Sequence, residues 1–154
     1  AEIDLSWECL PQLVYFLSSG YSDSEYYHHL TKEYEGNKIV MAPEFTMNTG
    51  ISYTQAIKSS LFKSFTATTS VTGFGTQYFD EANTMKQDPY FLWNMDLGIS
   101  GKHIDFHVWG KNILDKNFFC YMFNSPVGNN LPEYMKSGQS GAPSRFGASI
   151  TIKL

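Results

Sequence analysis

Residues 91–100 read FLWNMDLGIS and alternate strictly between two sets of side chains. Because successive side chains of a β-strand point to opposite faces of a sheet, the two sets would lie on opposite faces. One set is entirely apolar and the other is mixed. The apolar set is Phe91, Trp93, Met95, Leu97 and Ile99, and the mixed set is Leu92, Asn94, Asp96, Gly98 and Ser100. The segment therefore predicts a β-strand with one apolar face.

The same alternation recurs along the chain. Residues 104–111 and 145–154 repeat it clearly, whereas residues 13–22 and 62–79 are strand-like but less cleanly divided. No segment has convincing helical periodicity, so the sequence predicts an all-β protein. The expected strands lie near residues 2–9, 13–23, 44–54, 62–78, 90–100, 103–113 and 144–154.

The connections between the expected strands alternate in length. Short turns are expected at residues 9–12, 56–60 and 100–102, and long polar loops at about 24–43, 79–89 and 114–143. In an antiparallel meander this order places all short turns at one edge and all long loops at the other. Transmembrane β-barrels have this asymmetry. A soluble two-sheet module, in which the apolar faces pack against each other, is the alternative.

The composition fits a sheet that faces an apolar environment. Aromatic residues make up 16% of the chain and charged residues 17%, below the roughly 25% charged residues of typical soluble domains. The net charge is −4 and the basic residues are scattered, which argues against nucleic acid as a partner. No apolar run is long enough for a transmembrane helix, but a tilted membrane strand needs only about 9 to 11 residues.

The chain opens on Ala1 without an initiator Met or a signal peptide, so we expect it to be part of a longer protein. Seven antiparallel strands cannot close a bacterial single-chain barrel, so the missing strands are expected upstream or on another chain. Cys9 and Cys120 are too few for a disulfide framework or a cysteine zinc site, and the meander places them at opposite edges.

Four segments resemble the TonB-dependent outer-membrane receptors. Residues 111–118, KNILDKNF, resemble the family's KNLFDKxY stretch, and residues 141–147, GAPSRFG, are similar to its GxPRTFG entry into the last strand. Residues 42–48, APEFTMN, look like the xPxHTxN strand entry, and residues 78–84, YFDEANT, resemble the segment before the third-from-last strand. The resemblance covers nearly the whole chain, in the family's order.

The resemblance implies that residues 1–154 are the C-terminal segment of a barrel of about 22 strands. Earlier strands and the N-terminal plug domain would be absent from this chain. It also implies a transmembrane β-barrel receptor in the bacterial outer membrane that performs TonB-dependent transport, with iron uptake as a ferric siderophore the leading assignment. Two departures are Glu44, where the family more often has a basic or neutral residue, and the ending on Leu154 rather than an aromatic residue.

The implied partners are the lipid bilayer, the remainder of the barrel with its plug, TonB through the absent N-terminal part, and a ferric siderophore or similar chelate. Haem, cobalamin and glycans are alternative cargoes, and a passive porin is an alternative function. No nucleophile elbow, carboxylate pair or phosphate loop is recognisable, so we expect neither an enzyme nor a cofactor.

The candidate ligand contacts lie in the long loops. Their aromatic rings could stack on a flat chelate. For His28 and His29 solvated loop residues are the favoured interpretation, because adjacent histidines do not make a metal site. For the aromatic residues of the third loop, exposed packing within the loop is an equal alternative. His107 is expected in the hydrated interior, beside Asp105 and Lys111. Trp7, Tyr53, Tyr78 and Tyr90 are expected in aromatic girdles at the two membrane interfaces. The candidate ligand contacts are Tyr26, Tyr27, His28, His29, Tyr121 and Phe123.

Overall fold

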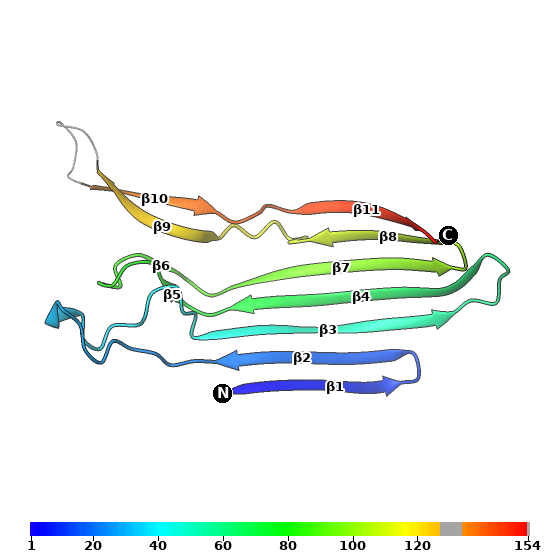
Figure 1. Cartoon of the computed structure of the whole chain (residues 1–154), viewed down its shortest axis with the longest axis horizontal. Helices are drawn as coiled ribbons and strands as arrows, with labels where there is room; N and C mark the ends of the chain where they lie inside the picture. Colours follow the sequence, from blue (N-terminus) through cyan, green and yellow to red (C-terminus); the bar gives the residue numbers. More distant parts are fainter. Residues whose placement is uncertain (127–133, 154) are drawn as a thin grey trace.

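The computed structural model describes residues 1–126 and 134–153 and consists almost entirely of β-strands (Figure 1). Seven strands form one antiparallel sheet in the order β1-β2-β3-β4-β7-β8-β11. The strands of this sheet are β1 (Glu2–Leu10), β2 (Leu13–Tyr21), β3 (Phe45–Ala56), β4 (Phe62–Phe74), β7 (Tyr90–Gly101), β8 (Ile104–Lys111) and β11 (Arg145–Ile152). All seven expected strands are therefore confirmed. The assignment of Leu154 to the last strand lies outside the described residues.

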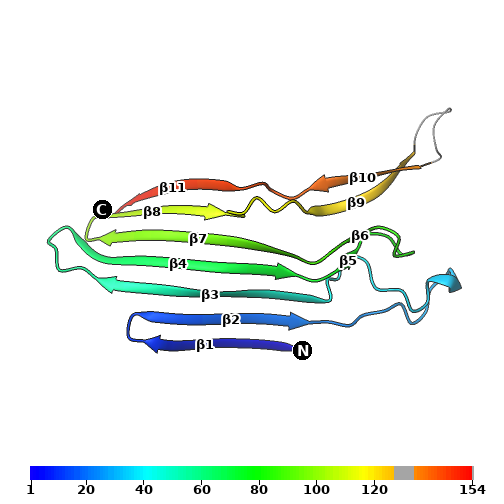
Figure 2. The ribbon, with the colours of Figure 1, turned by 180° about the vertical axis from the view of Figure 1, so that it is seen from behind.

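The connections are sorted by length between the two edges of the sheet, as the sequence predicts. The short connections 11–12, 57–61 and 102–103 lie together at one edge, which we call the turn rim (Figure 1). The long connections 22–44, 75–89 and 112–144 lie at the opposite edge, the loop rim, as the reverse view also shows (Figure 2). Cys9 and Cys120 lie at opposite ends and neither forms a disulfide.

The expected strand 62–78 is too long, because residues 75–78 do not belong to the sheet strand. The sheet strand β4 ends at Phe74, because the chain leaves the sheet at Gly75. A Cβ atom at Gly75 would stand 2.8 Å from the backbone nitrogen of Phe45, so the close approach of the two chains requires glycine here. Beyond it, β5 (Gln77–Tyr78) pairs with β6 (Lys86–Gln87) in a separate small hairpin.

The third long loop is more ordered than the sequence predicts. Instead of an irregular loop over 114–143, the structure contains a second hairpin of β9 (Phe119–Pro126) and β10 (Tyr134–Ser140). Polar residues are frequent in β10, which removes the apolar alternation from one of the two strands. The first long loop contains a short 3-10 helix, η1 (Lys32–Tyr34). No helix in the described part of the chain is long and apolar enough to cross a membrane.

The pairing register assigns every regularly paired residue to one of two faces. On one face, which we call the apolar face, no regularly paired residue of the seven strands is charged; Lys63, at the irregularity between Phe62 and Ser64, is not assigned to a face. All regularly paired charged residues of these strands lie on the other face, which we call the polar face. Most serines and threonines of β3 and β4 lie on this face too. The charged residues of the polar face are Glu2, Asp4, Glu8, Asp96, Asp105, His107, Lys111 and Arg145.

The apolar face is uncovered in the described residues. Ile3 is 63% exposed, Trp7 61% and Ile150 64%. The alternative of a two-sheet module with an internal core is therefore not supported, since no second sheet packs on this face within residues 1–126 and 134–153.

The aromatic residues expected in the two girdles lie on the apolar face near the turn rim but not near the loop rim. Trp7 and Tyr53 lie on the apolar face near the turns, as predicted. Tyr90 lies instead on the polar face and is buried between the rings of Phe74 and Phe118. Tyr78 has left the sheet and belongs to β5.

Candidate functional site at the loop rim

The first loop, residues 22–44, is held in shape by its own backbone. Tyr26 donates its amide to the carbonyl of Asn37, and Gly36 donates its amide to the carbonyl of Tyr26. Lys38 binds the carboxylates of both Asp23 and Glu25. The hydrogen bonds to these two carboxylates raise the pKa of Lys38 above its ordinary value, so this lysine stays charged.

The two candidate histidines have different environments. His29 packs between the rings of Tyr26 and Tyr34, at centroid distances of 5.1 Å and 5.2 Å, and its Nε2 lies 3.4 Å from a carboxylate oxygen of Glu81. The side chain of His28 is largely exposed; its ring is tilted by 58° against that of Tyr27, and its Nδ1 lies 3.7 Å from a carboxylate oxygen of Glu35. His29 therefore holds the loop together, whereas Tyr27 and His28 are free to contact a ligand.

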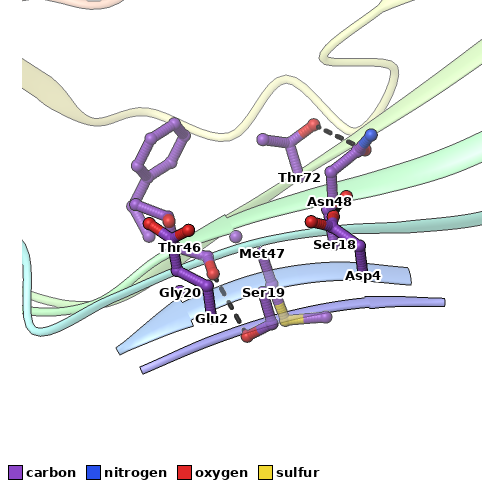
Figure 3. A pocket seen from close by; sticks show the side chains of 11 residues that line it. Glu2, Asp4, Ser18, Ser19, Gly20, Thr46, Met47, Asn48 and Thr72 are labelled. Carbon is purple, nitrogen blue, oxygen red and sulfur yellow. Dashed lines mark hydrogen bonds between the residues drawn. The ribbon is translucent and has the colours of Figure 1, made fainter. Parts of the chain in front are cut away.

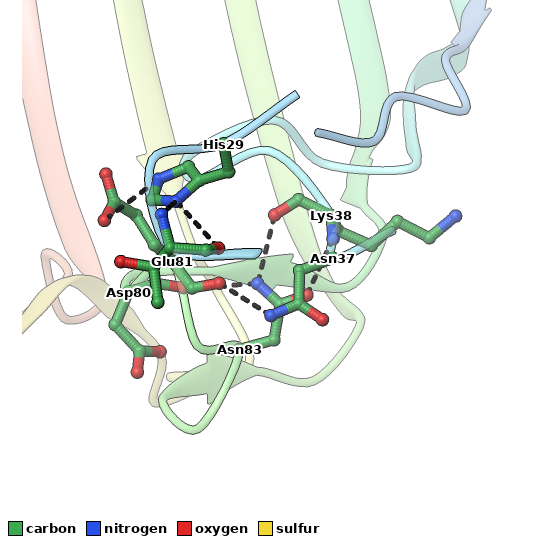
Figure 4. A network of polar contacts seen from close by, with 7 residues as sticks. His29, Asn37, Lys38, Asp80, Glu81 and Asn83 are labelled. Atoms are coloured by element: carbon green, nitrogen blue, oxygen red, sulfur yellow. Dashed lines mark hydrogen bonds and ion pairs between the residues drawn. The ribbon is translucent and has the colours of Figure 1, made fainter. Parts of the chain in front are cut away.

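The middle loop joins the first loop through Asn83, as Figure 4 shows. Its side chain accepts the amide of Lys38 at 2.7 Å and donates to the carbonyl of the same residue at 3.0 Å. Asp80 shapes the loop itself, because its carboxylate accepts the amide of Met85 and the hydroxyl of Thr84, each at 2.7 Å. Asn37 adds a hydrogen bond to the carbonyl of Glu81.

The middle loop also contacts the hairpin β9–β10. Tyr121 and Phe123 stack on one side of β9, with ring centroids 5.9 Å apart, and Phe79 packs edge-on against Tyr121. Gln87 accepts the amide of Phe119, and Lys136 donates to the carbonyl of Thr84. The middle loop therefore connects the two groups of candidate ligand contacts, which share no ring contact of their own among the described residues.

Two of the segments that carry the family resemblance meet in space. Asn112 is buried, and its side-chain amide donates to the carbonyls of Lys116 and Ala142, each at 3.0 Å. Asp115 accepts the amide of Ser144 at 2.7 Å. We call this arrangement of residues 112–116 and 142–144 the strand clasp, because it sets the start of β11. The resembling residues therefore have a structural role in this chain.

The polar face is acidic at one end. Near the loop rim, a cavity of about 350 Å³ lies across β1 to β4 (Figure 3). Glu2 and Asp4 contribute carboxylates to its lining, and Asp4 accepts a hydrogen bond from Ser18. Asn48 and Thr72 line its opposite side and are hydrogen-bonded to each other.

The other end of the polar face carries the basic residues. His107 lies 3.3 Å from the carboxylate of Asp96, and Lys153 binds Asp105 at 2.8 Å. His107 lies on the same face as Asp105 and Lys111, as the alternation predicts. Lys111 and Arg145 are directly opposite each other on β8 and β11. Arg145 is not among the candidate residues of the sequence analysis, although the strand alternation places it on this face.

The described residues contain no group of three or more His, Cys, Asp or Glu side chains that could hold a metal ion. The loop rim offers aromatic rings, hydroxyl groups and separated charges. The side chain of Tyr134, which the sequence places in the same loop, lies outside the described residues.

No protein-family model matches the chain. Its single seven-stranded antiparallel sheet is the fold of part of the wall of a large β-barrel. The chain is similar to the crystal structure of the ferric yersiniabactin uptake receptor FyuA from Yersinia pestis, with a TM-score of 0.76 and 17% identity. The match covers 98% of this chain and 22% of that receptor. At this identity the likeness establishes the fold alone.

Proposed function

We propose that the chain is the C-terminal segment of an outer-membrane receptor that imports a metal chelate, with a ferric siderophore as the first candidate cargo. The observation that carries the proposal is the division of one seven-stranded sheet into an uncharged apolar face and a polar face. The apolar face suits contact with lipid, because any charge there would be costly. The similarity in fold to a ferric chelate uptake receptor supports the same assignment.

In this proposal the polar face lines the interior and the loop rim faces outward. Tyr27, His28, Tyr121 and Phe123 are available at this rim, and a flat chelate would stack on their rings. Binding and release, rather than a chemical reaction, would be the function. The remaining strands and a plug would complete the barrel, and TonB would supply the energy for release.

The test is to express the full-length gene product and measure uptake of ferric catecholates, hydroxamates and phenolates in cells with and without TonB. Uptake of one chelate that depends on TonB would confirm the proposal. If small solutes of every kind instead enter the cells equally well with and without TonB, the product is a passive porin. A product that remains soluble without detergent would exclude the membrane assignment.

A further inference from the structure

The polar face has an aromatic surface beside two basic residues near the loop rim. The indole of Trp109 lies over Gly147 of the neighbouring strand, where a Cβ atom would stand 2.4 Å from Cζ2 of the ring. Only glycine leaves room for the indole in this position. Trp109 also lines a cavity of about 280 Å³, whose other polar-face walls are Thr68, Ser70, Asn94, Asp96 and Lys111.

Lys111 and Arg145 add two positive charges at the edge of this surface. They are paired residues on adjacent antiparallel strands, so their side chains leave the sheet on the same face. The Nζ of Lys111 stands 5.9 Å from the centre of the Trp109 ring. Like charges in this position repel each other and destabilise a sheet unless an anion lies between them.

The nearby acids have other partners. Asp96 is paired with His107, and Asp105 with Lys153. Asp115 accepts the amide of Ser144 and lies in the strand clasp. Within residues 1–126 and 134–153, neither Lys111 nor Arg145 forms an ion pair. Both side chains are exposed, so a ligand can reach them.

We propose that Trp109, Lys111 and Arg145 form a binding position for a planar anion, an aryl carboxylate or phenolate carried by the transported ligand. The indole would stack on the ring of the ligand, and the two cations would bind its oxygen atoms. Arg145 can bind two of these oxygens at once because its guanidinium is planar. This assignment rests on the proposed transport function and names the chemistry that this part of the wall recognises.

The test uses the full-length receptor in detergent, labelled with 5-fluorotryptophan, and follows the Trp109 signal by ¹⁹F NMR. Trp109→Phe assigns the signal. The probes are salicylate and its uncharged analogue salicylamide. We expect salicylate to shift the signal saturably and salicylamide to bind at least about tenfold more weakly. Lys111→Gln and Arg145→Gln should each weaken salicylate binding by about tenfold, as the loss of a charge-assisted hydrogen bond requires.

Lys58→Gln, at the turn rim, is the matched control and should leave salicylate binding unchanged. The absence of a shift, equal shifts with both probes, or full binding by Arg145→Gln would each overturn the proposal. The binding assay does not depend on TonB. Loss of TonB-dependent uptake with intact salicylate binding would therefore contradict the transport function and leave this site standing.

A second measurement identifies the source of the anion. If the ligand supplies it, Arg145→Gln relieves repulsion in the empty receptor, and the unfolding temperature stays the same or rises. A lower unfolding temperature would mean that an acidic side chain elsewhere in the full protein already occupies the position, and it would overturn the assignment to a ligand.

Discussion

Asn112 shows how one buried side chain fixes the geometry of a strand entry. It has a positive φ of 50° and satisfies backbone groups on both sides of the third long loop. The backbone amide of Asn112 donates to the side-chain oxygen of Asn94 on β7. Asparagine suits this position because it tolerates the left-handed conformation and carries both a donor and an acceptor.

Asn112→Ala should destabilise the full receptor by about 2–4 kcal/mol, because it leaves backbone groups without partners and strains the backbone. Asn112→Gly also removes the hydrogen bonds but accepts the positive φ, so it should cost about 1 kcal/mol less. Denaturant unfolding in detergent measures both variants. Equal losses would show that backbone strain contributes nothing at this position.

The three long loops are connected elements rather than independent ones. The middle loop holds the first through Asn83 and His29 and contacts the hairpin β9–β10 through Phe79 and Gln87. A ligand that moved one of the outer loops would therefore act on the other through the segment between β4 and β7.

Asn83→Ala should release the first loop from the middle loop. Because the Lys38 amide loses its acceptor, its hydrogen exchange should accelerate by roughly tenfold, whereas the amides of β3 and β4 should keep their protection. Hydrogen exchange with mass spectrometry makes the measurement, and Lys58→Ala at the turn rim is the control. Unchanged exchange at Lys38 would show that other contacts suffice.

The base of the hairpin β9–β10 depends on a glycine. A Cβ atom at Gly141 would stand 2.0 Å from Cζ of Phe118, whose ring also stacks on Tyr90 at 4.4 Å. Gly141→Ala should displace Phe118 and loosen the hairpin. Limited proteolysis should then cut within residues 114–143 faster than in the wild type, while Gly20→Ala on β2, where the nearest atom to the new Cβ is the Thr46 hydroxyl at 3.3 Å, should leave cleavage there unchanged. Equal cleavage rates in all three proteins would contradict the requirement for glycine.

Across the whole molecule, the two faces of the sheet differ in the charge they can carry. The regularly paired residues of the apolar face are uncharged over all seven strands. On the polar face the charged residues of β1 are all acidic, whereas Lys111 and Arg145 lie opposite each other on β8 and β11. The interior wall of the proposed barrel would therefore be negatively charged at β1 and positively charged near Lys111 and Arg145. A plug inside the barrel would contact both regions.

Leu97→Arg places a charge in the middle of the apolar face and should destabilise the membrane-inserted receptor by about 2–4 kcal/mol. Thr68→Arg places an arginine on the polar face instead, opposite Asp96 on the neighbouring strand. It should destabilise the inserted receptor by less than about 1 kcal/mol. Folding titrations into lipid vesicles compare the two variants. Equal costs would mean that the apolar face does not meet lipid.

The local alternation of side chains was sufficient to predict the seven strands of the main sheet, their faces and the sorting of turns and loops, but not the hairpin β9–β10. Each of these follows from the period of two along the chain, which needs no distant contact. Residues 91–100 show this most clearly, since every one of them lies on the predicted face.

The contacts between distant segments could not be predicted in the same way. The pairing of Asn112 with Ala142, the burial of Tyr90 between Phe74 and Phe118, and the opposition of Lys111 and Arg145 join residues from different strands and loops. Register and loop packing decide these contacts, and both depend on the positions of strands that are far apart in the chain. For the same reason, the proposed anion position became visible only when β8 and β11 were placed side by side.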